Sequence, residues 1–142
     1  LAVFCRDEPQ RLVGARETSL AETGTASEVL GRVRADATVA AWRNELGADM
    51  VGMIVENLAS ACGIGYLMGA VSTGFAPSAY QVTARGCAVG NLSFAHEHGH
   101  NMGMTHNPEN GSGAAYPYGY GHWVNGNFRT VMSYSNPCTS GC

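Results

Sequence analysis

A run of eleven residues, from His96 to His106, constrains this chain more than any other feature. It reads H-E-H-G-H-N-M-G-M-T-H and fits the spacing H-E-x-x-H-x-x-G-x-x-H. Residues four apart lie on the same face of a helix, so His96 and His100 are expected to project toward one point. Gly103 predicts the end of that helix, because glycine reaches backbone angles that other residues reach only at a cost. The chain can then turn and bring His106 to the same point as a third imidazole.

The three imidazoles predict a binding site for one catalytic zinc ion. Three histidines leave the fourth tetrahedral position open to water, as in catalytic rather than structural zinc sites. Glu97 lies about 100° further round the helix than His96, beside the metal, where it can transfer a proton. We therefore expect Glu97 to act as the general base on a zinc-bound water. The alternatives, surface histidines and a solvated carboxylate, do not explain the spacing.

The run resembles the extended zinc motif of the metzincin clan of metallopeptidases and matches it at every metal-binding position. This clan also has a Met-turn, a tight turn whose methionine lies beneath the zinc. The segment 130–134, T-V-M-S-Y, looks like that turn. The resemblance places Met132 as a soft apolar floor under the imidazoles, not as a ligand.

Tyr134 follows the methionine as in the similar Met-turns of serralysins and astacins. There the tyrosine can approach the metal or stabilise the oxyanion, and a phenol can donate a hydrogen bond to developing negative charge. The resemblance makes Tyr134 a candidate catalytic residue. The alternative is a core aromatic whose hydroxyl is already satisfied.

Three segments, 62–67, 87–97 and 128–134, look like the bacterial peptidyl-Asp metalloendopeptidases, and the resemblance runs from Leu12 to Cys138. Members of that family cut proteins or peptides on the amino side of Asp, and less readily of Glu or oxidised Cys. The resemblance implies the same specificity here. Two alternatives stay open: a metzincin that prefers apolar residues, as adamalysins do, and a truncated domain that binds zinc or a peptide without turnover.

Recognition of an acidic substrate side chain requires a cation. The chain has no lysine, and after Arg43 only Arg85 and Arg129 carry positive charge. Arg129 precedes Met132 by three residues, near the place where metzincins bind the residue after the cut. Both arginines are therefore candidate substrate-binding residues, and the alternative for each is a surface ion pair.

Three polar residues near the motif carry further expectations. His98 stands where the related families usually have leucine, so we expect it to face the core and to be partly solvated. His122, in a Gly-Tyr loop, is expected to be structural or exposed. Asn107 follows the third ligand where relatives often have Asp, and loss of that carboxylate is expected to loosen the loop but to spare the zinc.

The bulk properties fit a single secreted domain. A length of 142 residues is enough for one domain with a buried core. A net charge of −3 argues against nucleic acid as a partner, since phosphate binding needs a basic surface. No apolar run approaches the 18 or more residues of a membrane span. We expect a monomer that acts on protein or peptide substrates.

Five cysteines suggest an oxidising compartment. We favour the pairs Cys62–Cys87 and Cys138–Cys142, although four cysteines allow three pairings. Cys5 is left over, and its surroundings do not match the zinc-capping cysteine motif of some metzincins.

The hydrophobic pattern predicts an α+β fold of the metzincin type. A twisted mixed sheet packs against an active-site helix and a backing helix, followed by an irregular C-terminal subdomain with the Met-turn. The expected elements are an irregular segment at 1–10, strands at 12–20, 49–56, 64–68 (an edge strand) and 80–85, helices at 25–47 and 91–102, and an irregular subdomain at 107–142. Thr25 and Glu28 form a capping-box pattern at the start of the first helix. Because metzincins have a strand and a helix before the strand placed at Leu12, we expect the N-terminal edge of the fold to be truncated.

Overall fold

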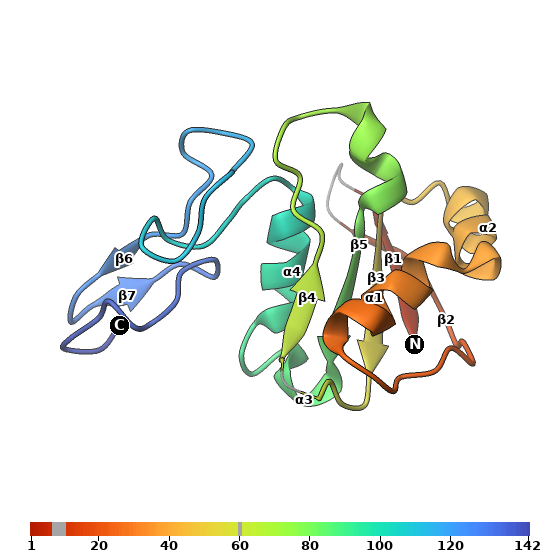
Figure 1. Ribbon diagram of the computed structural model, residues 1–142, viewed down its shortest axis with the longest axis horizontal. Coiled ribbons are helices and arrows are strands. Elements are labelled where there is room, and N and C mark those ends of the chain that lie inside the picture. Colours follow the sequence, from red (N-terminus) through yellow and green to blue (C-terminus); the bar gives the residue numbers. More distant parts are fainter. Residues whose placement is uncertain (7–10, 60) are drawn as a thin grey trace.

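A computed structural model describes residues 1–6, 11–59 and 61–142. It contains a five-stranded sheet and a short separate hairpin, in the strand orders β2-β1-β3-β5-β4 and β6-β7 (Figure 1). The elements in chain order are β1 (Ala2–Arg6), β2 (Arg11–Arg16), α1 (Ala26–Ala35), α2 (Ala37–Leu46), β3 (Met50–Val55), β4 (Gly63–Gly65), the 3₁₀ helix η1 (Thr73–Ser78), β5 (Tyr80–Ala84), α3 (Arg85–Ala88), α4 (Ser93–Asn101), β6 (Trp123–Val124) and β7 (Phe128–Arg129). The expected α+β class is confirmed.

The sheet is mixed. Strands β3 and β5 are parallel neighbours, and β4 pairs antiparallel with β5 at the edge. The continuous apolar run of β3 is buried in the sheet, as its sequence predicts, since a strand covered on both faces has no polar side. The expected edge strand is β4, which is shorter than predicted.

The N-terminal segment differs from the expectation. Residues 2–6 form β1, which pairs antiparallel with both β2 and β3, so the prediction of an irregular start and of no strand before Leu12 is wrong. Five residues are too few to show a period, and the edge of β3 supplies the backbone partners that the sequence alone does not reveal. Residues 7–10 of the same prediction, and the side chain of Cys5, lie outside the described part.

The expected helix at 25–47 is two helices, α1 and α2. Asp36 separates them: its backbone is extended, and its carboxylate accepts a hydrogen bond of 2.8 Å from the Val39 amide. An aspartate that caps a new helix in this way competes with continuation of the old one. The Thr25–Glu28 capping box is present, and Gly47 ends α2 in the left-handed conformation (φ 57°).

The two faces of the sheet have different side chains. Alternate residues of β3 and β5 (Val51, Met53, Val55, Tyr80, Val82 and Ala84) form one core cluster with Val29, Leu30 and Val33 of α1. Of the residues between them, Gly52, Gln81 and Thr83 are small or polar, and Ile54 is the apolar exception. A Cβ on Gly52 would lie 2.9 Å from the Phe94 ring of α4. Because this face is so thin, α4 lies close against the sheet.

The segment after α4 lies to one side of that helix, away from the sheet (Figure 1). It is irregular apart from the β6-β7 hairpin. Within residues 88–142, all of which are described, Met132 is the one buried apolar side chain. The C-terminal subdomain therefore has almost no apolar core of its own.

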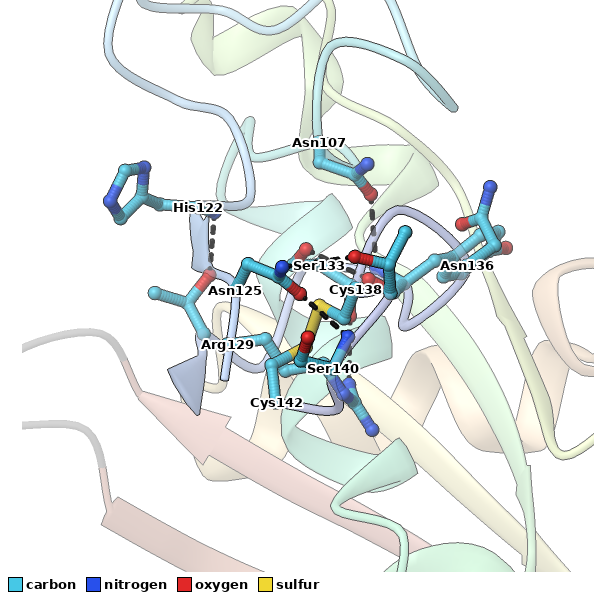
Figure 2. The surroundings of a disulfide bond; sticks show 12 residues. Asn107, His122, Asn125, Arg129, Ser133, Asn136, Cys138, Ser140 and Cys142 are labelled. Carbon is cyan, nitrogen blue, oxygen red and sulfur yellow. Dashed lines mark hydrogen bonds between the residues drawn. A yellow bond between two sulfur atoms is a disulfide. The ribbon is translucent and has the colours of Figure 1, made fainter. Parts of the chain in front are cut away.

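Two disulfides cross-link the chain. Cys62–Cys87 joins the start of β4 to α3, and Cys138–Cys142 closes a small loop near the C-terminus (Figure 2). Both favoured pairs are confirmed.

None of the helices in the described residues has the length and apolar character needed to cross a membrane.

Candidate active site

Helix α4 presents the first part of the site. His96, Glu97 and His100 lie on it, and it ends at Asn101. Gly103 then takes a left-handed conformation (φ 86°), and the chain turns so that Thr105 forms a bridge with Tyr120. This turn brings His106 back toward the helix. The helix expected at 91–102 and its glycine stop are confirmed.

The three histidines converge. Their ligand atoms all lie within 4.8 Å of one another, and the Nε2 atoms of His96 and His106 are 3.1 Å apart. Tetrahedral zinc with bonds of 2.0–2.1 Å would hold its nitrogens about 3.3 Å apart. The donor set therefore fits a metal ion of this kind.

Backbone carbonyls orient two of the rings. Nδ1 of His96 lies 2.8 Å from the Val131 oxygen, and Nδ1 of His100 lies 2.9 Å from the Met104 oxygen. A proton on each Nδ1 leaves the Nε2 lone pair free for a metal. Burial lowers the pKa of all three histidines, that of His100 to about 4. The imidazoles are therefore neutral at physiological pH, as metal ligands must be.

Glu97 is buried beside the cluster, with 7% of its surface exposed. Burial raises its pKa to about 7, against a smaller lowering by a hydrogen bond from the Gly65 amide. A carboxyl with such a pKa can both accept and release a proton near neutral pH.

The edge strand β4 is glycine-rich because Glu97 and its helix lie against it. A Cβ on Gly63 would lie 2.6 Å from Glu97 Cγ, and one on Gly65 would lie 2.7 Å from the Glu97 carbonyl oxygen. These two glycines are not among the site residues that the sequence predicts. Their G-x-G pattern at an edge strand was the available signal, since interior glycines mark close approach.

The turn at 130–134, which the sequence predicts to be the Met-turn, packs against α4. A Cβ on Gly99 would collide with the sulfur of Met132, which is 4% exposed. The Met132 thioether thus lies against the helix turn between His96 and His100. A second glycine, Gly121, touches the turn from the other side, where its own Cβ would lie 2.6 Å from the Ser133 nitrogen.

Tyr134 faces the histidines. Its ring centroid is 4.2 Å from that of His106 and 6.3 Å from that of His96. Partial burial, with the charge of Glu97 as a smaller cause, raises the pKa of its hydroxyl. The phenol is therefore protonated at neutral pH and can donate a hydrogen bond.

The two candidate arginines have different surroundings. Arg129 donates a 2.7 Å hydrogen bond to the Ser133 carbonyl and lines a cavity of about 310 Å³ with Tyr134, Ser135 and Asn136. Figure 2 shows Arg129 among the C-terminal loops. Arg85 instead forms a two-bond ion pair with Glu56 at the surface, at 2.8 and 2.9 Å. Arg129 thus lies beside the site. Arg85 forms a surface ion pair, which is the alternative stated for it above.

His98 is buried, and the expected partial solvation is wrong. Its ring stacks on Phe94 at a centroid distance of 4.4 Å, and its Nδ1 lies 3.2 Å from Gln81 Nε2. It fits because Gly52 leaves room on the sheet beneath it. His122 is exposed, as expected.

The expectation that Asn107 loosens the loop after the third histidine is also wrong. Asn107 is fully buried and hydrogen-bonded at both ends of its amide, so the loop after the third histidine is tied down rather than loosened.

The sheet, α4 and the histidine cluster define a domain of the metzincin-like metallopeptidase class. The family model Reprolysin_5, metallo-peptidase family M12, matches residues 5–141, and the chain belongs to this family.

Curated proteins that are similar to this chain are named peptidyl-Asp metalloendopeptidases. The peptidyl-Asp metalloendopeptidase of Xanthomonas campestris is 36% identical over 131 residues, which cover 88% of this chain and 30% of that protein. That of Stenotrophomonas maltophilia (strain R551-3) is 32% identical, over 93% of this chain and 32% of that protein. That of Pseudomonas aeruginosa is also 32% identical, over 74% of this chain and 21% of that protein. The chain thus spans a third or less of these relatives. A solved structure titled "Structure of a chaperone-substrate complex" matches with a TM-score of 0.60 and 28% identity, over 80% of this chain and 18% of that one.

Proposed function

We propose that this chain is the catalytic domain of a zinc endopeptidase that cuts peptide bonds on the amino side of Asp, and less readily of Glu. The convergence of three neutral histidines next to the buried carboxyl of Glu97 is the observation that carries this proposal. The names of the curated relatives support the preference for Asp.

His96, His100 and His106 would hold the ion. When bound, zinc polarises the scissile carbonyl and lowers the pKa of a water molecule to about 7. The carbonyl contacts of His96 and His100 fix both rings before the ion arrives, so little ordering of these side chains is needed on binding.

Glu97 and Tyr134 supply the remaining chemistry. Glu97 accepts the proton of the attacking water and passes it to the leaving nitrogen, so no covalent intermediate is needed. The Tyr134 hydroxyl donates a hydrogen bond to the oxyanion that forms on the carbonyl. Burial of Glu97 against β4 keeps bulk water from competing for its proton.

Arg129 would recognise the acidic side chain after the cut. Its Nη1 is held by the Ser133 carbonyl, and other guanidinium donors are available to the cavity beside Tyr134. An arginine fixed in this way binds a carboxylate with little loss of side-chain entropy. Arg85 is the second candidate, although binding substrate would require it to leave Glu56.

We also propose secretion and action as a monomer on protein or peptide substrates, without nucleic acid or membrane. Two disulfides support an oxidising compartment. The net charge of −3 does not favour phosphate binding.

Peptide mapping tests this function. A denatured protein is digested with the chain, with a Glu97→Gln variant, and with a chelated sample. Cuts before Asp that vanish in both controls support the proposal. Cuts before apolar residues would retain the mechanism and remove the acid preference. No cleavage by a folded sample with one zinc would contradict catalysis.

Arginine variants test the specificity. Arg129→Ala should lower kcat/KM for an Asp substrate by about 10- to 100-fold and leave cleavage before apolar residues less affected. Arg85→Ala is the comparison variant. If it, rather than Arg129→Ala, removes the Asp preference, the assignment passes to Arg85.

A further inference from the structure

Asn107, directly after the third histidine, uses both ends of its buried amide. Its Oδ1 accepts a hydrogen bond of 2.9 Å from the Tyr134 amide, and its Nδ2 donates one of 2.8 Å to Glu109 Oε2. Its side chain has no exposed surface. Figure 2 shows the Asn107 side chain directed at the C-terminal loops.

The amide fits these two partners because it offers both an acceptor and a donor. The Tyr134 N–H needs an acceptor, while the Glu109 carboxylate accepts only and so needs a donor. An aspartate at 107 would offer Glu109 no donor and would add a like charge. An apolar residue would leave the Tyr134 amide without its acceptor, which is costly where the amide is partly buried.

Glu109 determines which way round the amide lies. Because the bond to Glu109 involves a charge, it is stronger than one between neutral groups, and it holds the NH₂ end toward the carboxylate. The pKa of Glu109 is lowered, and the bond from Asn107 is the first cause. The oxygen end of the amide is thereby directed at Tyr134.

Tyr134 depends on this contact for its position. The residue is 45% exposed, so packing alone holds its side chain weakly, yet its ring centroid lies 4.2 Å from that of His106. His106 and Asn107 are adjacent in the chain. The distance between the third ligand and the tyrosine is therefore set through one side chain.

We propose that Asn107 and Glu109 act as one positioning unit that holds Tyr134 over the third histidine. This inference rests on the proposed function for its kinetic consequence, but not for its structural one. Neither residue touches the reacting atoms. Glu109, an exposed residue with no evident role in the sequence, becomes part of the support of the site.

A four-member cycle tests the pair in the zinc-loaded chain: wild type, Asn107→Asp, Glu109→Gln and the double variant. In Glu109→Gln the amide oxygen still accepts from Asn107, so kcat/KM should stay within about twofold of wild type. Asn107→Asp leaves a buried carboxylate oxygen without a donor and should lower kcat by about tenfold or more. In the double variant the glutamine NH₂ can donate to Asp at 107, so most of that loss should be recovered.

Hydrogen exchange at the Tyr134 amide is measured on the same four proteins. Exchange should be faster in Asn107→Asp and slow again in the double variant. If the chain has no peptidase activity, the proposed function fails while this measurement still tests the positioning unit. Asn127→Asp, at an exposed site in the β6-β7 turn, adds the same charge and should change neither quantity.

A double variant no better than Asn107→Asp in both measurements would overturn the proposal. If Asn107→Asp does not fold, Glu109→Ala replaces it, because Glu109 is exposed and its loss spares the core. Unchanged Tyr134 exchange in Glu109→Ala would likewise overturn the positioning role.

Discussion

Replacement of Gly121 by alanine tests how rigidly the Met-turn is held. Gly121 is buried, and its amide donates to the Thr105 carbonyl at 3.0 Å, which ties it to the segment of the third histidine. A Cβ there would lie 2.6 Å from the Ser133 nitrogen and 2.7 Å from the Met132 carbonyl carbon and oxygen. Ordinary contact begins at 3.4 Å, so the turn would have to retreat by about 0.8 Å.

The expected cost follows from these distances. The neighbours are backbone atoms, which cannot rotate away as the end of a side chain can. Overpacking of this kind costs about 1–3 kcal/mol, against which restriction of the unfolded chain returns about 0.4–1 kcal/mol. We expect Gly121→Ala to lower the free energy of unfolding by about 1–2 kcal/mol. A displacement approaching 1 Å next to the histidines should also lower kcat/KM by about 10- to 100-fold.

Gly31→Ala is the matched control. Gly31 lies in α1, and a Cβ there meets nothing within 4 Å. The same substitution should raise the free energy of unfolding by about 0.5–1 kcal/mol through helix propensity. Urea unfolding and cleavage of an Asp peptide are measured on both zinc-loaded variants. If Gly121→Ala is as stable and as active as Gly31→Ala, the Met-turn is not fixed by this contact and the reasoning is refuted.

Three further results are expected. Chelation should lower the melting temperature, because an ion at 1,000 times its Kd stabilises the folded chain by about 4 kcal/mol; an unchanged thermal transition would argue against the site. Asp36→Ala should cost about 1 kcal/mol in urea unfolding through loss of the α2 cap, and no change would show that the Val39 bond is not formed in solution. The pKa of Glu28 is lowered by its hydrogen bonds from Thr25, so its contribution is complete above the usual carboxyl pKa of 4.5 and is lost as pH falls through the lower folded value. The difference in melting temperature between wild type and Glu28→Ala should therefore be constant from pH 7 to about 5 and shrink in more acidic solution, and a difference independent of pH would contradict the capping box.

The parts of the fold that could be predicted are those with a complete local pattern. The spacing of His96, His100 and Gly103 determines both the helix and its end, and the apolar run at 50–55 is long enough to indicate a buried strand. The strand at residues 2–6 has no such pattern, because its partner is an edge that exists only after folding. The break at Asp36 could have been predicted, since an aspartate three residues before Val39 is an N-cap signal. The apolar stripe that continues through both helices concealed it.

Within the site, too, residues in a local pattern could be predicted, and residues whose partners are distant in the sequence could not. The three histidines and Glu97 follow from one helix and one turn. The roles of Gly63, Asn107 and Glu109 depend on segments that meet only in three dimensions, across an irregular loop without a period. The burial of His98 likewise depends on a contact between distant segments, since Gly52 of β3 leaves the room for its ring and no local pattern indicates this.

The near absence of an apolar core after α4 means that the two halves of the chain are stabilised by different means. Burial of side chains by α1 and the sheet maintains the first half whether or not an ion is present. The second half depends on hydrogen bonds, on the Cys138–Cys142 disulfide and on the convergence of His106 with His96 and His100 of α4. The cavity beside Arg129 belongs to that second half. An ion bound by His106 together with His96 and His100 would therefore tie the second half of the chain to α4, in addition to its proposed part in catalysis.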